Sequence, residues 1–218
     1  MRALTIAIDG PSGAGKGTVA RAVAKHLGYR HVDSGAMYRA VGWKALRDEV
    51  PFDDEPRVAK IAAHADLSVT DEAVMIDGTD VTRAIRTPEI DRAATAVARL
   101  PQVRAALVMR QRAYGADGGI VMEGRDIGTV VFPAADIKVY LDASPDERAR
   151  RRAQDPAHSG GPIAVADVET ALTARDELDR TRPVSPLYAA QDAVVIDTTG
   201  QSIDEVVERV LALVHARI

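Results

Sequence analysis

GPSGAGKGT, residues 10–18, is the stretch of this 218-residue sequence that decides the fold. The apolar run Leu4–Ile8 before it predicts a buried strand, and the pattern Gly15–Leu27 after it predicts a helix. Glycines let such a turn direct its backbone N–H groups inward, where they and the helix N-terminus can surround phosphate oxygens. Lys16 can add a compact positive charge beside the β- and γ-phosphates. The segment therefore predicts a site for a nucleoside triphosphate.

The loop departs from the usual phosphate-binding motif at one position. That motif has Ser or Thr directly after the lysine, where the hydroxyl coordinates Mg²⁺. Here Gly17 follows Lys16, and Thr18 comes one residue later. We therefore expect no direct protein ligand to Mg²⁺ here and water-mediated coordination instead. A glycine-rich turn that binds nothing is the alternative interpretation.

Strand and helix patterns alternate along the rest of the chain. Further apolar runs predict strands at Tyr29–Val32, Gly119–Met122, Ile137–Leu141 and Ala193–Ile196. Because parallel strands need crossover helices, the alternation predicts an α/β, three-layer P-loop fold with five parallel strands, as a single domain over 1–218. Its ligands should bind beyond the carboxyl ends of the strands. The helical patterns are Gly15–Leu27, Ala36–Leu46, Pro88–Tyr114, Pro145–Gln154, Val165–Arg180 and Ile203–Ala216.

Two segments interrupt the alternation. Leu67–Val69 and Val74–Ile76 flank a polar turn, which predicts a small antiparallel unit within an insert at about 61–97. The segment DPAHSGGP at 155–162 has no apolar anchor and predicts a mobile surface loop. We expect it to form part of a lid at about 150–166.

Composition restricts the partners. The formal net charge of −4 argues against a general nucleic-acid or anionic-membrane binder, because such surfaces select a basic excess. The chain has no cysteine, which excludes disulfides, thiolate metal sites and a cysteine nucleophile and fits a reducing compartment. No apolar stretch reaches the length of about 20 residues that a membrane span needs. We expect a cytoplasmic, monomeric protein.

Three further segments, together with GPSGAGKGT, resemble bacterial cytidylate kinases. They are DSGAMYR at 33–39, EGRDIGTVVFP at 123–133 and RDELDRTRPVSPL at 175–187, and they occur in that family's order along the whole chain. The resemblance implies transfer of the γ-phosphoryl group of ATP to CMP or dCMP, with Mg²⁺ as cofactor. It also implies an acceptor-binding insert and a short lid.

The resemblance implies a role for each matching residue. The catalytic set is Lys16, Arg125, Asp126 and Arg182. The ATP-binding set is Gly10, Pro11, Ser12, Gly13, Ala14, Gly15, Lys16, Gly17, Thr18, Arg148, Arg151 and Arg152. The CMP-binding set is Ser34, Gly35, Arg39, Thr95, Arg104, Arg125, Asp126, Arg175, Asp179 and Arg182.

Arg125 and Asp126 directly follow a predicted central strand, beside the phosphate loop. A surface ion pair is the ordinary explanation for such neighbours and is worth little energetically. At the carboxyl end of the strand, however, the guanidinium fork of Arg125 suits phosphate oxygens. Asp126 only accepts hydrogen bonds, which suits an exocyclic amino group such as that of cytosine and disfavours the carbonyl of uracil. The pair therefore predicts a preference for CMP over UMP.

The other acceptor residues have ordinary explanations that remain open. Asp33 and Ser34 can cap a helix, although a helix N-terminus also suits an anion that Arg39 could reach. Thr95 stands where the family often has Ser, and it and Arg104 could be exposed helix residues.

Two arginine-rich helix faces also have a simpler explanation. Arg175, Asp179 and Arg182 fall on one face at i, i+4 and i+7, as an exposed ion-paired surface would. The same holds for the basic face formed by Arg148, Arg151 and Arg152. A lid closing on a triphosphate needs cations at this place, so we favour the functional interpretation.

Two rival functions remain at this point. One is a kinase of this fold with another acceptor: UMP, AMP or a non-nucleotide such as shikimate. The other is a nucleotide-dependent switch. A guanine-nucleotide switch usually carries Asn-Lys-x-Asp, which does not occur in this sequence.

Overall fold

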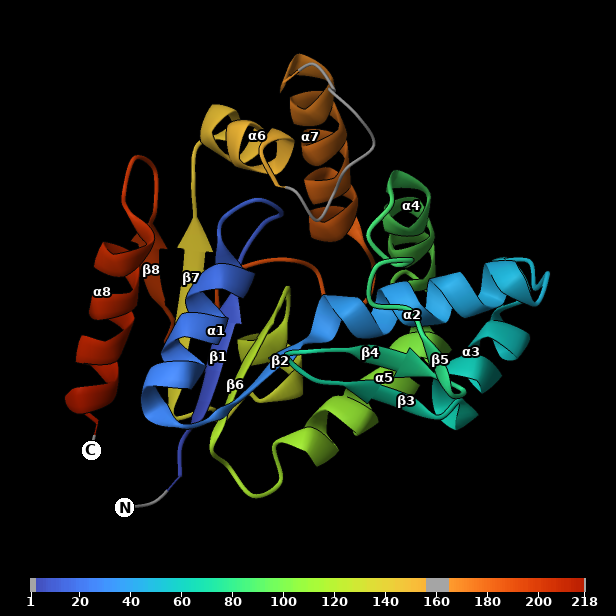
Figure 1. The fold of residues 1–218 in the computed structure, drawn as a ribbon, viewed down its shortest axis with the longest axis horizontal. Coiled ribbons are helices and arrows are strands. Elements are labelled where there is room, and N and C mark those ends of the chain that lie inside the picture. The colour runs from blue at the N-terminus through green and yellow to red at the C-terminus, as the bar shows by residue number, and fades with distance from the viewer. Residues whose placement is uncertain (1–2, 156–164, 218) are drawn as a thin grey trace.

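The computed structural model describes residues 3–155 and 165–217. Its central sheet has five parallel strands in the order β2-β6-β1-β7-β8 (Figure 1). The strands are β1 (Thr5–Asp9), β2 (Arg30–Asp33), β6 (Ile120–Gly124), β7 (Ile137–Asp142) and β8 (Val194–Asp197). The predicted α/β fold and parallel sheet are therefore confirmed, and the strand boundaries differ from the predicted ones by one or two residues.

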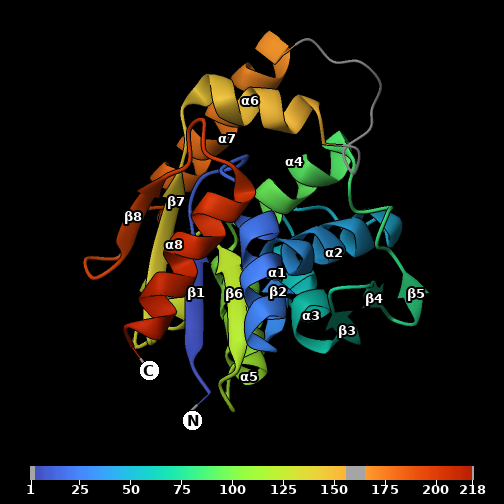
Figure 2. The same ribbon diagram turned by 60° about the vertical axis from the view of Figure 1, so that its left-hand side comes forward.

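Helices cover both faces of this sheet, as its apolar strands require (Figure 2). On one face, Ile6 and Ile8 pack against α1 (Lys16–Leu27) and α8 (Ile203–His215). On the other face, Ala7 and Met122 pack with Val108 of α5 (Pro101–Tyr114). Alternate β1 residues thus contribute to two cores, which fixes the strand ends that carry the site.

The insert forms a separate apolar core beside the sheet. It contains the predicted antiparallel unit, in which β3 (Leu67–Val69) pairs with β4 (Val74–Ile76), extended by the unpredicted β5 (Thr79–Asp80). This sheet packs against α2 (Ser34–Arg47), which also packs against α3 (Glu55–His64) and α4 (Pro88–Val97) (Figure 1). The helix α3 was not predicted, although Asp54 caps it and a proline stands in its first turn.

The long helical pattern predicted from Pro88 to Tyr114 is wrong in one respect: it forms two helices. The break includes Leu100, which has extended backbone angles (φ −83°, ψ 114°), and Pro101 begins α5. Proline disfavours helical angles in the preceding residue and has no N–H to donate, so it starts a helix more easily than it continues one. The break turns α4 and α5 in different directions (Figure 1).

An arm of two helices, α6 (Pro145–Ala153) and α7 (Val165–Thr181), lies beyond the carboxyl ends of the strands (Figures 1 and 2). The predicted lid at 150–166 and the predicted mobile loop at 155–162 fall largely on residues 156–164, which lie outside the described residues. Within the described ranges, no helix has both the length and the apolarity to cross a membrane.

Candidate functional site

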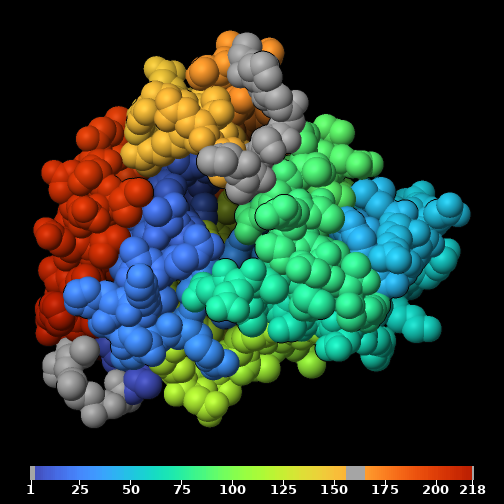
Figure 3. Space-filling view, in the orientation of Figure 1, coloured from blue at the N-terminus to red at the C-terminus, as the bar shows by residue number. Residues whose placement is uncertain are grey.

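A cavity of ≈ 1500 Å³ opens where the strands end, between the phosphate loop, the insert and the α6–α7 arm (Figure 3). A pocket for one small ligand usually measures about 300–1,000 Å³, so this volume can hold two. Twelve Lys and Arg side chains line the cavity, against seven Asp and Glu. Its lining therefore favours polyanions although the whole chain carries a net charge of −4.

The phosphate loop lines one end of the cavity from Ser12 to Thr18. Gly13 (φ 81°) and Gly15 (φ 89°) adopt left-handed angles that favour glycine, and they direct the loop around its centre. The Lys16 ammonium is buried and donates to the Pro11 carbonyl at 2.7 Å. Burial, helped by the nearby Arg125, lowers the pKa of Lys16 to about 7. The negative charge of a triphosphate bound in this loop would raise the pKa of Lys16 again.

The first two residues of the predicted ATP-binding segment lie outside the cavity lining. A Cβ atom on Gly10 would lie 2.0 Å from the Leu141 carbonyl oxygen, so this glycine permits close packing of the loop on β7. Pro11 likewise does not line the cavity, and its carbonyl accepts from Lys16. Both residues shape the loop from behind.

Glu123 occupies the space next to Gly17. A Cβ atom on Gly17 would lie 2.7 Å from Oε1 of Glu123, at the end of β6. A carboxylate thus lies where the usual motif has a serine or threonine hydroxyl. Glu123 also lies 3.5 Å from Nε2 of the buried His31, whose Nδ1 contacts Asp71 of the insert at 2.6 Å. The glycine that departs from the motif therefore makes room for a carboxylate that we did not predict as a site residue.

Arg148 is not part of the cavity lining, although we predicted it as a lid cation. Its guanidinium is buried, donates to the Ser12 carbonyl at 3.1 Å and pairs with Asp176 of α7. Asp176 in turn accepts from the Ser12 N–H at 3.2 Å. This buried pair ties the phosphate loop to both helices of the arm. We did not predict Asp176 as a site residue, because its role depends on a contact with Ser12, 164 residues away in the sequence.

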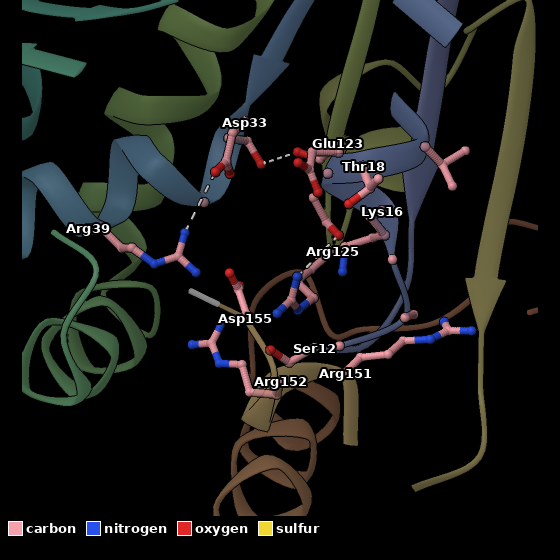
Figure 4. Close-up of a pocket in the computed structure, with 18 of the residues that line it drawn as sticks. Ser12, Lys16, Thr18, Asp33, Arg39, Glu123, Arg125, Arg151, Arg152 and Asp155 are labelled. Atoms are coloured by element: carbon pink, nitrogen blue, oxygen red, sulfur yellow. Dashed lines mark hydrogen bonds and ion pairs between the residues drawn. The ribbon is translucent and has the colours of Figure 1, made fainter. Parts of the chain in front are cut away.

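Arg151 and Arg152 do line the cavity, but they extend to different sides of it (Figure 4). Arg151 donates to the Thr198 hydroxyl at 2.9 Å and to its carbonyl at 2.7 Å, beside the phosphate loop. Arg152 extends toward the side that carries Arg39 (Figure 4) and pairs with Asp91 of α4. The predicted basic face therefore divides between the two halves of the cavity.

Asp126 lies buried at the other end of the cavity, between two arginines. Arg104 of α5 donates to its Oδ2, and Nη2 of Arg182 lies 3.5 Å from its Oδ1. Tyr38 completes this corner: its ring lies 5.6 Å from the Arg104 guanidinium, and burial raises the pKa of its hydroxyl to about 12. Asp126 and Arg125 do not pair with each other, so the alternative of a surface ion pair between these neighbours is wrong.

Asp126 directly precedes a short π-helix, η1 (Ile127–Val131), whose position fixes that of Asp126. The two carboxylate oxygens of Asp9 accept from the N–H groups of Ile127 and Gly128 at 2.8 and 2.7 Å. Burial raises the pKa of Asp9 to about 6. The last residue of β1 thus holds the loop that follows β6.

Between the two ends lie the residues predicted to bind the acceptor phosphate and ribose. Arg125 donates from Nε to Asp179 at 3.0 Å. Burial alone would lower the pKa of Arg125, but the carboxylates of Asp179 and Asp176 together raise it. The pKa of Arg39 is raised in the same way, because the carboxylates of Asp33 and Asp91 outweigh the lowering effect of burial. Burial lowers the pKa of Arg175. These side chains share one wall of the cavity.

The helix-capping alternative for Asp33 and Ser34 is half correct. Asp33 caps α2 by accepting from the Ala36 N–H at 3.0 Å. Ser34 does something else: its hydroxyl donates to the Glu123 carbonyl at 2.6 Å, across two strand ends. Gly35 lines the cavity beside them. Thr95 also lines it, with its hydroxyl donating to the Asp91 carbonyl at 2.9 Å.

The family model for cytidylate kinase matches residues 6–216 of this chain. The chain belongs to the cytidylate kinase family. A curated relative from Desulfitobacterium hafniense (strain Y51), named cytidylate kinase, is 47% identical over 99% of this chain and 94% of its own length. Another so named, from Pelotomaculum thermopropionicum, is 47% identical over 97% of this chain and 96% of its own.

A solved structure extends the likeness to the fold alone. A gluconokinase from Sinorhizobium meliloti 1021 matches with a TM-score of 0.50 and 16% identity, over 99% of this chain and 93% of that one. The predicted family and fold are both confirmed.

Proposed function

We propose that this protein transfers the γ-phosphoryl group of ATP to CMP or dCMP, giving ADP and CDP or dCDP. The observation that carries the proposal is one cavity with two different ends. The phosphate loop with Lys16 lies at one end, and Asp126, held between Arg104 and Arg182, lies at the other. A donor and an acceptor nucleotide bound there would have their phosphates between the two ends.

The reaction needs no covalent intermediate. A phosphate oxygen of CMP attacks the γ-phosphorus in line, and the bond from that phosphorus to the oxygen it shares with the β-phosphate breaks. Lys16 would stabilise the charge that develops on the transferred group, and Arg125 would orient the attacking phosphate. Arg39 and Arg175 line the same wall and favour a second, monophosphate site. Closing the cavity would exclude water and so limit hydrolysis of ATP.

At the base end, Asp126 would accept a hydrogen bond from the exocyclic amino group of cytosine. Its buried carboxylate already faces the Arg104 and Arg182 guanidinium groups, which fix its orientation. Uracil would bring a carbonyl oxygen to the same place, where it would be repelled. Thr95 and Tyr38 line the cavity nearby and would limit the size of the base.

Magnesium fits this site as a phosphate-bound ion. In the part of the chain that the structure describes, no cluster of three carboxylate, His or Cys side chains could hold a metal by itself. Glu123 and Thr18 line the loop end of the cavity and would hold the ion through its water molecules. The ion would neutralise phosphate charge during transfer.

Replacing Glu123 tests this assignment. Glu123→Gln keeps the shape next to Gly17 but removes the charge, so the Mg²⁺ concentration for half-maximal activity should rise, by about tenfold. Titration of Mg²⁺ at fixed ATP measures it. Asp71→Asn, which removes a carboxylate from the other side of His31, serves as the control. An unchanged Mg²⁺ requirement in Glu123→Gln would place the ion elsewhere.

A coupled assay of ADP production tests the function itself. CMP, dCMP, UMP, AMP and shikimate are offered as separate acceptors at saturating ATP. We expect turnover with CMP and dCMP, weak turnover with UMP and none with AMP or shikimate. Equal rates with UMP and CMP would refute the role of Asp126, and no ADP with any acceptor would refute a kinase.

The setting of the reaction is also a proposal. The nucleotides it requires, together with the absence of cysteine, support a cytoplasmic enzyme of pyrimidine nucleotide metabolism. We further propose that it acts as a monomer on free nucleotides, without nucleic acid or membrane. Light scattering of the purified protein, with and without ATP and CMP, measures the oligomeric state.

A further inference from the structure

Asp91, on the first turn of α4, is surrounded by arginines from three other helices. Its Oδ1 accepts from Nε of Arg39, on α2, at 3.1 Å and lies 3.1 Å from Nη1 of Arg175, on α7. Its Oδ2 pairs with Nη2 of Arg152, on α6. One carboxylate from the insert therefore contacts α2 and both helices of the α6–α7 arm.

An ordinary role at a helix end does not account for this arrangement. Acidic residues in the first turn stabilise a helix through its dipole, and the exposed Glu89 offers that charge two residues earlier. The Asp91 side chain is only 16% exposed. Burying a carboxylate is costly unless it is paired, and a group of three guanidiniums is more than one carboxylate requires.

The three arginines line the cavity, whereas Asp91 lies behind them and does not line it. Each guanidinium has five N–H donors, and the contact with Asp91 uses one nitrogen of each. Nη1 of Arg39 also lies 3.8 Å from Oδ2 of Asp33. Nε of Arg175 is buried, with no hydrogen-bond partner among the described residues. The three guanidiniums are thus paired with Asp91 on the side away from the cavity, while the same side chains line the cavity.

Without Asp91, these arginines would repel one another. Burial, together with the charges of Arg39 and Arg175, lowers the pKa of Arg152 to about 10, although Asp91 opposes the shift. Like charges this close, partly shielded from water, separate unless an anion compensates them. A bound phosphate can do so only after it arrives. A carboxylate already in place removes that ordering cost from substrate binding.

We propose that Asp91 is a positioning residue for the acceptor phosphate. It holds Arg39, Arg152 and Arg175 together on the cavity wall and so joins the insert to the α6–α7 arm. The arginines contact the monophosphate, and Asp91 acts through them. This inference rests on the proposed function, because it assigns the group of arginines to the acceptor of that reaction.

Asp91→Asn tests the proposal with little change of shape. The neutral amide cannot balance three guanidiniums, and its NH₂ group would face one of them. We expect the KM for CMP to rise by about tenfold, less than the hundredfold that a misplacement of about 1 Å can cost, while the KM for ATP stays within about twofold. Asp91→Glu keeps the charge and should recover part of the loss. Binding of CMP without ATP, measured by calorimetry, should weaken by the same factor.

Glu89→Gln is the matched control, since it removes one charge from the same helix turn without touching the arginines. It should leave both KM values unchanged. An unchanged or lower KM for CMP in Asp91→Asn would overturn the proposal, and so would an equal rise in both KM values accompanied by a lower Tm. If Asp91→Asn does not fold, Asp91→Ser takes its place under the same criteria. Wild-type turnover of CMP is measured alongside, so that its absence counts against the function and not against Asp91.

Discussion

In the proposed function, the single side chain of Asp126 selects which base the acceptor can carry. Both its oxygens already face arginines, so a base that donates a hydrogen bond joins an existing polar group without disturbing it. A base that accepts one would face two lone pairs instead. We therefore expect specificity at this position to come from an acceptor of fixed orientation, which repels the lone pairs of a base that only accepts there.

Asp126→Asn should lower the ratio of kcat/KM for CMP to that for UMP. An amide can donate to the uracil carbonyl, and the loss of a charged acceptor costs about 1.5–3 kcal/mol, or roughly 10- to 100-fold in kcat/KM for CMP. The KM for ATP should change little. Steady-state kinetics with both acceptors measures this. Asp179→Asn, the control on the ribose side, should weaken both acceptors alike, and a constant CMP:UMP ratio in Asp126→Asn would contradict the assignment.

Lys16 links nucleotide binding to proton uptake. Burial lowers its pKa to about 7, so without a nucleotide the side chain is mostly neutral at pH 8, and the negative charge of a bound triphosphate should protonate it. Binding of ATP should then take up about 0.9 proton at pH 8 and about 0.1 at pH 6. Calorimetry in two buffers with different ionisation enthalpies counts these protons. Lys16→Met should abolish the difference and reduce mainly kcat, whereas equal uptake at both pH values would show that Lys16 is already charged.

Among the elements, η1 depends on a strand to which it is not adjacent in sequence. Asp9, the last residue of β1, supplies both acceptors for the first N–H groups of η1. Asp126 directly precedes these groups, so the base-reading residue takes its position from β1 and β6 together. The first N–H groups of a helical segment have no partner within it, and Asp9 accepts from two of them here.

Asp9→Asn should therefore destabilise the fold and weaken CMP binding together. The amide offers one acceptor in place of two, which costs about 1–3 kcal/mol of unfolding free energy. The pKa of Asp9 is raised to about 6, so between about pH 4 and 6 the folded protein binds more protons at this site than the unfolded chain. The contribution of Asp9 to stability accordingly falls as pH rises through that window.

Urea unfolding at pH 4.5 and pH 7 measures the loss of stability and its pH dependence, and calorimetry with CMP measures the loss of binding. The stability lost on Asp9→Asn should be larger at pH 4.5, where the wild-type carboxyl is mostly protonated in the fold. Asp136→Asn, at the opposite end of the sheet, is the control for a general charge effect; its carboxylate accepts from the Thr5 N–H at 2.9 Å. An equal loss at both pH values would mean that Asp9 titrates normally.

The sequence was sufficient for elements with a strong local signal and insufficient for those without one. Apolar runs predict the five strands, and the glycines predict the loop at 10–18. The helix α3 is short and was overlooked although its start carries a capping Asp54, and the break before Pro101 was hidden by apolar residues on both sides. Element boundaries depend on such local details.

The site residues, like the elements, could be predicted where a local sequence segment marks them and not where their role depends on distant contacts. Lys16, Arg125 and Asp126 lie in recognisable segments beside strand ends, and they line the cavity. Asp176 and Asp91 act through partners distant in sequence, so no local pattern singles them out. Arg148 shows the opposite error, since a basic helix face cannot reveal which of its members turns inward.

As a whole molecule, the protein combines a net negative charge with a positively lined cleft between two apolar cores. The insert and the α6–α7 arm face each other across this cleft (Figure 3). A field of this shape repels anions from the outer surface and concentrates them at the cavity. Nucleotide capture should therefore depend on the cleft and not on net charge.

Ionic strength tests this whole-molecule picture. Salt screens the cleft, since the Debye length falls from about 30 Å at 0.01 M to about 3 Å at 1 M. Raising NaCl from about 0.02 to 0.5 M at constant Mg²⁺ should increase the KM for CMP several-fold with kcat nearly constant. Cytidine, which has the base and ribose but no phosphate, is the control: its inhibition constant should stay flat, because its binding depends on short buried contacts around Asp126. Because the net charge of −4 would repel CMP less as salt rises, a KM that falls with salt would show that the overall charge outweighs the cleft.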